Sequence, residues 1–179
     1  MARERKRPMR PENAVERAVT RRARPAPGST AEQVQALEKQ LGRERARERL
    51  GVSERTMRRY RAGGAPSKAN AEKIKREAAI SPRREARLRN KGAYVRMTGN
   101  IGAVSPGKKR GGQRHRTIGD TSAIHLSGEQ MAEILDRYHA GDEEGAVEAL
   151  REALGEEYYG GITFDDLTRL EFLRDDPTE

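Results

Sequence analysis

The apolar positions of this chain recur mostly at helical spacing, and they predict a protein built mainly from α-helices. Residues three and four positions apart are apolar over 30–41, 43–61, 67–79 and 128–154, and a basic helix is expected over 82–91. Alternating or β-branched stretches at 93–97 and 122–126 predict short strands, and "GGITF" and "LEFL" give weaker strand or turn signals. The predicted fold class is mainly α with a small β element.

The predicted ends of these helices follow from capping residues. Thr30 with Gln33, and Ser127 with Gln130, have the spacing of a capping box. Ser67 and Asp142 are placed to cap two further helices. We therefore divide the chain into a basic disordered tail (1–28, with about one helical turn near 14–19), a helix-turn-helix domain (29–91), a basic Gly-rich linker with a short strand (92–120) and an acidic strand-helix-helix domain (121–179).

Charge is segregated along the chain. Residues 1–116 hold 33 Lys and Arg against 11 Asp and Glu, whereas residues 117–179 hold 4 against 17. Such polarity predicts that the basic part binds a polyanion, which we expect to be DNA, and that the acidic part serves another purpose. The alternative is ordinary surface charge in a chain rich in Arg and Glu.

The residue types present exclude several kinds of site. Cys is absent, so disulfides and thiolate metal sites are excluded. His115, His125 and His139 are well separated, and adjacent carboxylates such as those at 165–166 and 175–176 rarely hold one ion; we expect no metal and no cofactor. No apolar run approaches a membrane span, which predicts a cytoplasmic, nucleoid-associated protein without a membrane partner.

The stretch "ARERLGVSERTMRRYRAGG" at 46–64 predicts a helix-turn-helix. Ala46 and Leu50 face inward, Gly51 makes the turn, Val52 fills the core behind it, and Ser53 caps the second helix. Met57 and Tyr60 anchor that second helix, which leaves six of its side chains free. Those six are Glu54, Arg55, Thr56, Arg58, Arg59 and Arg61.

These side chains have different predicted roles on DNA. Arg55 and Thr56, in the first turn, are best placed for base edges, while Arg58, Arg59 and Arg61 suit phosphates. The predicted DNA-binding set is Ser53, Arg55, Thr56, Arg58, Arg59 and Arg61. Winged-helix and homeodomain variants remain open, as does an Arg-rich helical hairpin without a partner.

The acidic part resembles a ribbon-helix-helix unit, in which two chains pair their single strands. Ser122, Ile124 and Leu126 are expected to face the helices, and Thr121, Ala123 and His125 to face outward. A lone strand cannot pair its own edge, so this interpretation predicts a homodimer through 121–160. The alternative is a small acidic helical domain packed on its own chain.

Three stretches occur together in the order of one known family. They are "LEKQLGRERARERLGVSERTMRRY" at 37–60, "KGAYVRMTGNIGAVSPG" at 91–107 and "AIHLSGEQMAEILDRYHAGDEEGAVEALREALGEEYYG" at 123–160. The chain resembles the telomere-protecting terminal proteins of Streptomyces linear replicons. The resemblance implies telomere binding and protein priming, in which a side-chain hydroxyl accepts the first nucleotide from a DNA polymerase. It also implies partners, namely that polymerase and a telomere-associated protein.

The resemblance implies an acceptor hydroxyl soon after a Pro-Gly pair. Here Pro106 and Gly107 are followed by three cations, so Thr117 is the nearest substitute, and Thr121, Ser122 and Ser105 are further candidates. The activating metals belong to the polymerase, so the chain itself is not expected to be an enzyme. The alternative function is a dimeric helix-turn-helix regulator or plasmid-maintenance protein that never becomes covalently linked to DNA.

Overall fold

The computed structural model describes residues 8–20, 28–103, 114–157 and 161–176, and these form eight helices and four strands. The predicted class, mainly α with a small β element, is confirmed at this level. The chain divides into two compact units. Unit 1 comprises Met1–Arg21 and Arg87–Glu179, and unit 2 comprises Arg22–Ala86.

Unit 2 is entirely helical in its described part. Its complete helices are α2 (Thr30–Leu41), α3 (Arg43–Leu50), α4 (Glu54–Arg61) and α5 (Lys68–Ala79), and α6 (Pro82–Lys91) begins at its end. Their apolar faces form one core, made of Val34, Leu37, Ala46, Leu50, Met57, Tyr60 and Ile74. The helices predicted from apolar spacing in this region are therefore confirmed.

The start of α2 corrects one detail of the prediction. Ser29, with an extended backbone (φ −105°, ψ 153°), is the capping residue, and its hydroxyl accepts a hydrogen bond from the Glu32 amide at 3.3 Å. Glu32 reaches back to the Ser29 amide at 3.0 Å, which completes the capping box. The predicted box of Thr30 and Gln33 is wrong, because Thr30 is already helical and cannot adopt the extended conformation of a cap.

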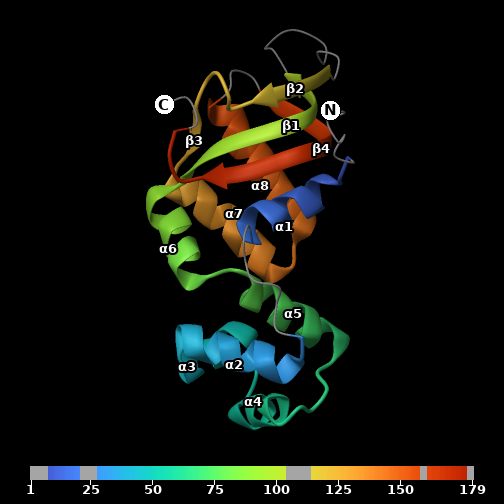
Figure 1. Cartoon of the computed structure of the whole chain (residues 1–179), viewed down its shortest axis with the longest axis vertical. Coiled ribbons are helices and arrows are strands. Elements are labelled where there is room, and N and C mark those ends of the chain that lie inside the picture. The colour runs from blue at the N-terminus through green and yellow to red at the C-terminus, as the bar shows by residue number, and fades with distance from the viewer. Residues whose placement is uncertain (1–7, 21–27, 104–113, 158–160, 177–179) are drawn as a thin grey trace, which may run out of the picture. The chain divides into compact units, whose positions relative to one another are not determined.

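Unit 1 is organised around β1 (Ala93–Ala103), the central strand of an antiparallel sheet (Figure 1). β2 (Arg114–Ile118) and β3 (Ile124–Leu126) pair with successive parts of β1, and β4 (Ile162–Leu173) pairs with it along nearly its whole length. The interpretation of 92–120 as a linker is therefore wrong for its described residues. Pairing with a strand 60 to 80 residues further along the chain orders β1 well beyond the predicted 93–97.

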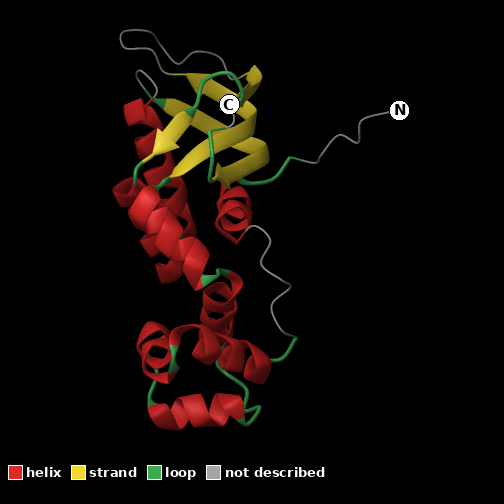
Figure 2. Cartoon of the chain, turned by 60° about the vertical axis from the view of Figure 1, so that its left-hand side comes forward, coloured by secondary structure: helices red, strands yellow, loops and turns green. Residues whose placement is uncertain are grey.

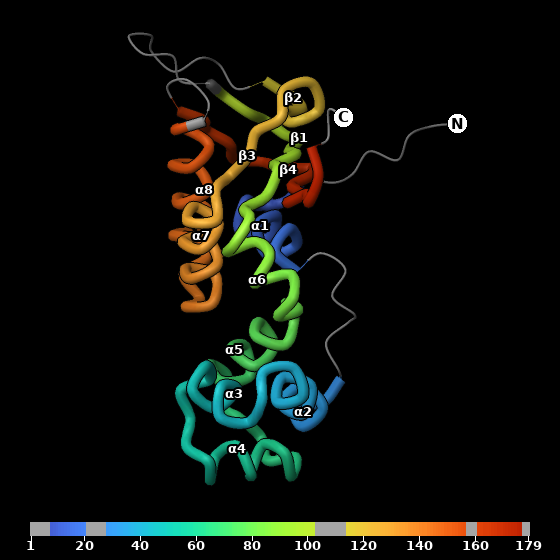
Figure 3. Tube along the Cα trace, turned by 90° about the vertical axis from the view of Figure 1, so that its left-hand side faces the viewer, coloured from blue at the N-terminus to red at the C-terminus, as the bar shows by residue number. Residues whose placement is uncertain are grey.

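Helices cover the apolar side of this sheet. α7 (Gly128–Ala140) and α8 (Glu143–Glu157) run side by side on one side of the strands (Figure 3). From Ala93 to Ile101, odd-numbered β1 residues such as Val95 and Met97 are buried, whereas the even-numbered residues are at least partly exposed. Ser127 with Gln130 forms the predicted capping box, and Asp142 accepts from the Gly145 amide as a predicted cap does.

The interpretation of 1–28 as a disordered tail is wrong for Pro11–Thr20, which forms α1. Ala14, Val15, Ala18 and Val19 are buried, and α1 packs against β4 and α8 within unit 1 (Figure 2). Just before α1, Met9 exchanges two backbone hydrogen bonds with Leu167 of β4. Four apolar residues are too few to predict a stable helix alone, and the sheet supplies the surface that orders them.

The strand predicted at 122–126 finds a pairing partner within its own chain, and the homodimer through 121–160 stays a prediction. β3 pairs with β1 of the same chain, with Val95 opposite Ile124 and Ala93 opposite Leu126. Ile124 and Leu126 face inward as expected, but Ser122 is exposed. The strand thus finds its partner about 30 residues earlier in the sequence, in the short strand that was predicted at 93–97.

Candidate nucleic-acid interface

A tight turn between α3 and α4 sets the position of α4. Gly51 ends α3 with left-handed backbone angles (φ 67°, ψ 34°), a conformation that favours glycine. Val52 packs against the core of unit 2, and the Ser53 hydroxyl accepts from the Thr56 amide at 3.2 Å, which caps α4. The predicted turn, core and cap residues are confirmed.

Two side chains hold α4 against the rest of unit 2. Met57 is 0% exposed and Tyr60 is 1% exposed, and both belong to the shared core. The Tyr60 hydroxyl accepts a hydrogen bond from the Asn70 side chain of α5 at 2.9 Å, so this buried polar group is satisfied. Burial of these two residues fixes which side of α4 is left for solvent.

That outward side carries three arginines. At 100° per residue, Arg55, Arg58 and Arg59 lie on the side of α4 opposite Met57 and Tyr60, and all three are exposed. The Arg59 guanidinium carbon lies 5.3 Å from the Tyr60 ring centroid, so its side chain covers the edge of the core. In the described part of the chain, neither Arg55 nor Arg59 forms an ion pair.

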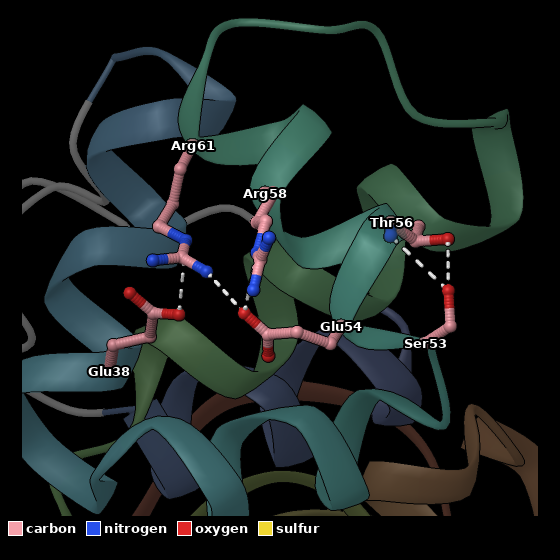
Figure 4. A network of polar contacts seen from close by, with 6 residues as sticks. All are labelled: Glu38, Ser53, Glu54, Thr56, Arg58 and Arg61. Atoms are coloured by element: carbon pink, nitrogen blue, oxygen red, sulfur yellow. Dashed lines mark hydrogen bonds and ion pairs between the residues drawn. The ribbon is translucent and has the colours of Figure 1, made fainter.

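Arg61 differs from its predicted state as a free side chain. Its Nη2 lies 2.8 Å from Glu54 Oε1 and its Nε lies 3.5 Å from Glu38 Oε1 on α2 (Figure 4). Only 22% of the Arg61 side chain is exposed. The expectation that Arg61 is free is therefore wrong, because the flank of α4 on which it lies faces carboxylates of its own unit.

Glu54 is likewise engaged rather than free. Its Oε1 also lies 3.3 Å from Nε of Arg58, so one carboxylate serves two cations. The pKa of Glu54 lies below the ordinary glutamate value: burial acts to raise it, but hydrogen bonds and charge from Arg58 and Arg61 outweigh that effect. Thr56, on the other flank, is half-buried, with its Oγ1 3.0 Å from Ser53 Oγ.

The charge excess of the chain lies in unit 2. Counted over the sequence, unit 2 holds 17 Lys and Arg against 8 Asp and Glu, whereas unit 1 holds 20 against 20. The basic and acidic parts of the sequence are thus not the two units of the structure, because the basic middle segment folds together with the acidic helices. The excess positive charge coincides with the unit that exposes α4.

The candidate acceptor hydroxyls are not equivalent. Thr117 lies in β2, exposed, with its hydroxyl oxygen 3.1 Å from that of Thr98 on β1. Thr121 and Ser122 are exposed in the segment between β2 and β3. Ser105 lies outside the described residues. These residues belong to or follow the predicted linker 92–120, whose residues 114–118 are instead paired as a strand with β1.

Sequence reasoning missed a group of ionic side chains inside unit 2. Arg49 on α3 lies 2.6 Å from Glu77 on α5 and 2.6 Å from Glu85 on α6. Side-chain exposure is 2% for Glu77 and 9% for Glu85, so two carboxylates are buried around one guanidinium. Glu77 lies on the inward face of α5 with Ile74. A charged residue at an inward position indicates a buried ion pair, and this was the feature of the sequence that could have predicted the group.

Comparison of the chain with protein families, with curated proteins and with solved structures found no match in any of the three. Among the described residues, no helix is both long and apolar enough to cross a membrane, and no group of three or more potential metal ligands is found. The family resemblance therefore rests on the sequence motifs alone.

Proposed function

We propose that unit 2 binds duplex DNA as a helix-turn-helix domain, with α4 in the major groove and α3 supporting it. The main observation in support of this proposal is that Met57 and Tyr60 are buried, so Arg55, Arg58 and Arg59 face outward from one helix. A major groove about 12 Å wide accommodates an α-helix. Unit 2 also carries the excess positive charge of the chain, which favours a polyanionic partner.

Position along α4 assigns the roles. Arg55 lies in the first turn, where recognition helices approach base edges, and an arginine pairs with guanine through two hydrogen bonds. Arg59, one turn further, and Arg58 beside it are placed for phosphates, which set the register without reading sequence. Arg61 is not assigned to DNA, because Glu38 and Glu54 hold it.

Two substitutions test this assignment on the full-length protein. A preferred duplex is first selected from random sequences, and binding to it and to an unrelated duplex is measured over a range of salt. Arg55→Ala is expected to cost about 1–3 kcal/mol on the preferred duplex and to relax one base position. Arg59→Ala is expected to weaken both duplexes alike and to reduce the salt slope by about one unit.

Arg17→Ala serves as the matched control, because it removes one exposed arginine from α1 of unit 1. It is expected to leave the salt slope unchanged. If Arg55→Ala and Arg59→Ala lower binding to every duplex by the same factor, the sequence-reading role of α4 is refuted. If the wild-type protein binds no duplex, the proposed function itself is refuted.

The motif resemblance extends this proposal to a biological setting. We propose that the chain is a terminal protein that binds the ends of a linear replicon and primes their synthesis. The hydroxyl oxygen attacks the α-phosphorus of a deoxynucleoside triphosphate, the α–β phosphate bond breaks and pyrophosphate leaves. The polymerase supplies the metals and takes up the hydroxyl proton.

All three hydroxyls are exposed, and position favours Thr121 and Ser122, which lie between β2 and β3, over Thr117, which is held in β2 beside Thr98. The protein is incubated with a labelled deoxynucleotide, the polymerase of its host and an end-containing template, and label that survives denaturation is scored. Thr121→Val with Ser122→Ala is expected to abolish the label, while Thr117→Val retains it. If the wild-type protein forms no adduct, the priming proposal is refuted and the alternative, a dimeric DNA-binding regulator, is favoured. For a regulator, a palindromic site with half-sites about 34 Å apart is expected.

A further inference from the structure

The carboxylate of Glu54 lies at the start of α4, between the cations of Arg58 and Arg61 (Figure 4). The first turn of a recognition helix is the part that comes closest to DNA. Glu54 is 42% exposed, so its negative charge is presented on the border of the surface proposed above to meet the groove. A carboxylate in that position is repelled by the phosphates of DNA, so it weakens the attraction of α4 for DNA.

The two arginines are held to different degrees. Arg61 forms ion pairs with two carboxylates: its Nη2 lies 2.8 Å from Glu54 Oε1, and its Nε lies 3.5 Å from Oε1 of Glu38, whose side chain is only 11% exposed. Arg58 is 76% exposed and lies 3.3 Å from Glu54 across one helical turn, a geometry of weak attraction in water. Phosphate can therefore compete with Glu54 for Arg58 far more readily than for Arg61.

In the absence of Glu54, the side chains of Arg55, Arg58 and Arg59 would face no carboxylate on α4, and only Glu38 would remain beside Arg61. Each cation that neutralises a phosphate strengthens binding to any DNA sequence equally, because phosphates carry no sequence information. A nearby carboxylate reduces that general attraction, and it does so without touching Arg55, which lies one residue further round the helix. Because this contribution is the same for every sequence, it cancels from the ratio of two affinities and changes only their common level.

We propose that Glu54 limits the sequence-independent part of the DNA binding inferred above: it holds Arg61 against Glu38, competes with phosphate for Arg58, and thereby lowers the affinity for DNA of any sequence. The inference rests on the proposed function of α4. In the bound state Arg55 reads bases, Arg59 contacts phosphate, and Glu54 keeps the remaining two cations from adding sequence-independent attraction.

The test is Glu54→Gln in the full-length protein, because glutamine keeps the shape of the side chain and removes its charge. Binding is measured on the preferred and on an unrelated duplex over a range of salt. The affinity for the unrelated duplex is expected to rise by roughly tenfold at low salt, and the slope of log affinity against log salt to steepen by about 0.9, the value for one added phosphate contact. The affinity for the preferred duplex is expected to rise by the same factor, so the ratio of the two affinities stays unchanged.

Glu72→Gln is the matched control, since it removes one exposed carboxylate from α5 of the same unit. It is expected to leave both the slope and the two affinities unchanged. Arg58→Ala in the Glu54→Gln background is expected to remove the added slope, and in the wild-type background to change it by much less. Circular dichroism and the thermal midpoint confirm that every variant is folded before its binding is compared.

Three results separate the possible failures. A loss of affinity confined to one base position after Glu54→Gln overturns the inference and makes Glu54 a base-reading residue, since a carboxylate can accept from the cytosine amino group. Equal slopes and equal affinities in wild type, Glu54→Gln and Glu72→Gln also overturn it. If wild type binds no duplex at all, the proposed function fails first, and the inference fails with it.

Discussion

Replacement of Arg49 by methionine is expected to destabilise unit 2 strongly. The guanidinium lies 2.6 Å from each of two carboxylates, Glu77 and Glu85, whose side chains are 2% and 9% exposed. Methionine fills a similar volume but leaves these buried charges without that cation, and removing one member of a buried ionic group costs about 3–5 kcal/mol. A unit of about 65 residues has roughly 3–10 kcal/mol of stability, so the loss is comparable to the whole.

Hydrogen exchange of the α5 amides measures this loss in the intact chain, because the slowest exchange in unit 2 reports its global opening. Arg45→Met, on the exposed side of the same helix α3, is the control and is expected to stay within about 0.5 kcal/mol of wild type. Adding Glu77→Gln and Glu85→Gln to Arg49→Met should recover part of the loss, because it removes the buried charges. An Arg49→Met protein within about 1 kcal/mol of wild type would refute the argument that these carboxylates depend on Arg49.

Two further predictions concern backbone and pH. A Cβ at Gly92 (φ +70°) would lie 1.9 Å from the Leu126 carbonyl oxygen, so Gly92→Ala should lower the urea midpoint of the chain far more than Gly51→Ala. At Gly51 (φ +67°) the nearest atom is 3.8 Å away, and only the left-handed backbone costs about 1–2 kcal/mol. The Gly145 amide and Arg137 hold the pKa of Asp142 below its ordinary value of 3.8. The stability that Asp142 contributes is therefore present above that value and is lost as pH falls through the lowered pKa; acid unfolding followed by circular dichroism should lose this dependence in Asp142→Asn.

The sequence by itself determined the elements whose causes are local. Ser53 caps α4, Gly51 takes the left-handed conformation that the turn needs, and Met57 and Tyr60 recur at helical spacing on the buried side. Each of these features depends on residues within one or two helical turns, so the spacing alone predicts them. The outward positions of Arg55 and Arg59 follow directly, because the buried face of a helix fixes its exposed face.

Only the tertiary structure decided features that depend on residues distant in sequence. β1 is ordered by β4, which begins almost 60 residues after β1 ends, and α1 is ordered by the sheet and α8. The Arg61 side chain faces Glu38 on a different helix rather than solvent. Thr117 lies in a strand because it pairs with Thr98 of β1. Periodicity reports which face of an element is apolar but not which element covers it, so strand partners and ion pairs between helices were fixed only when the chain packed.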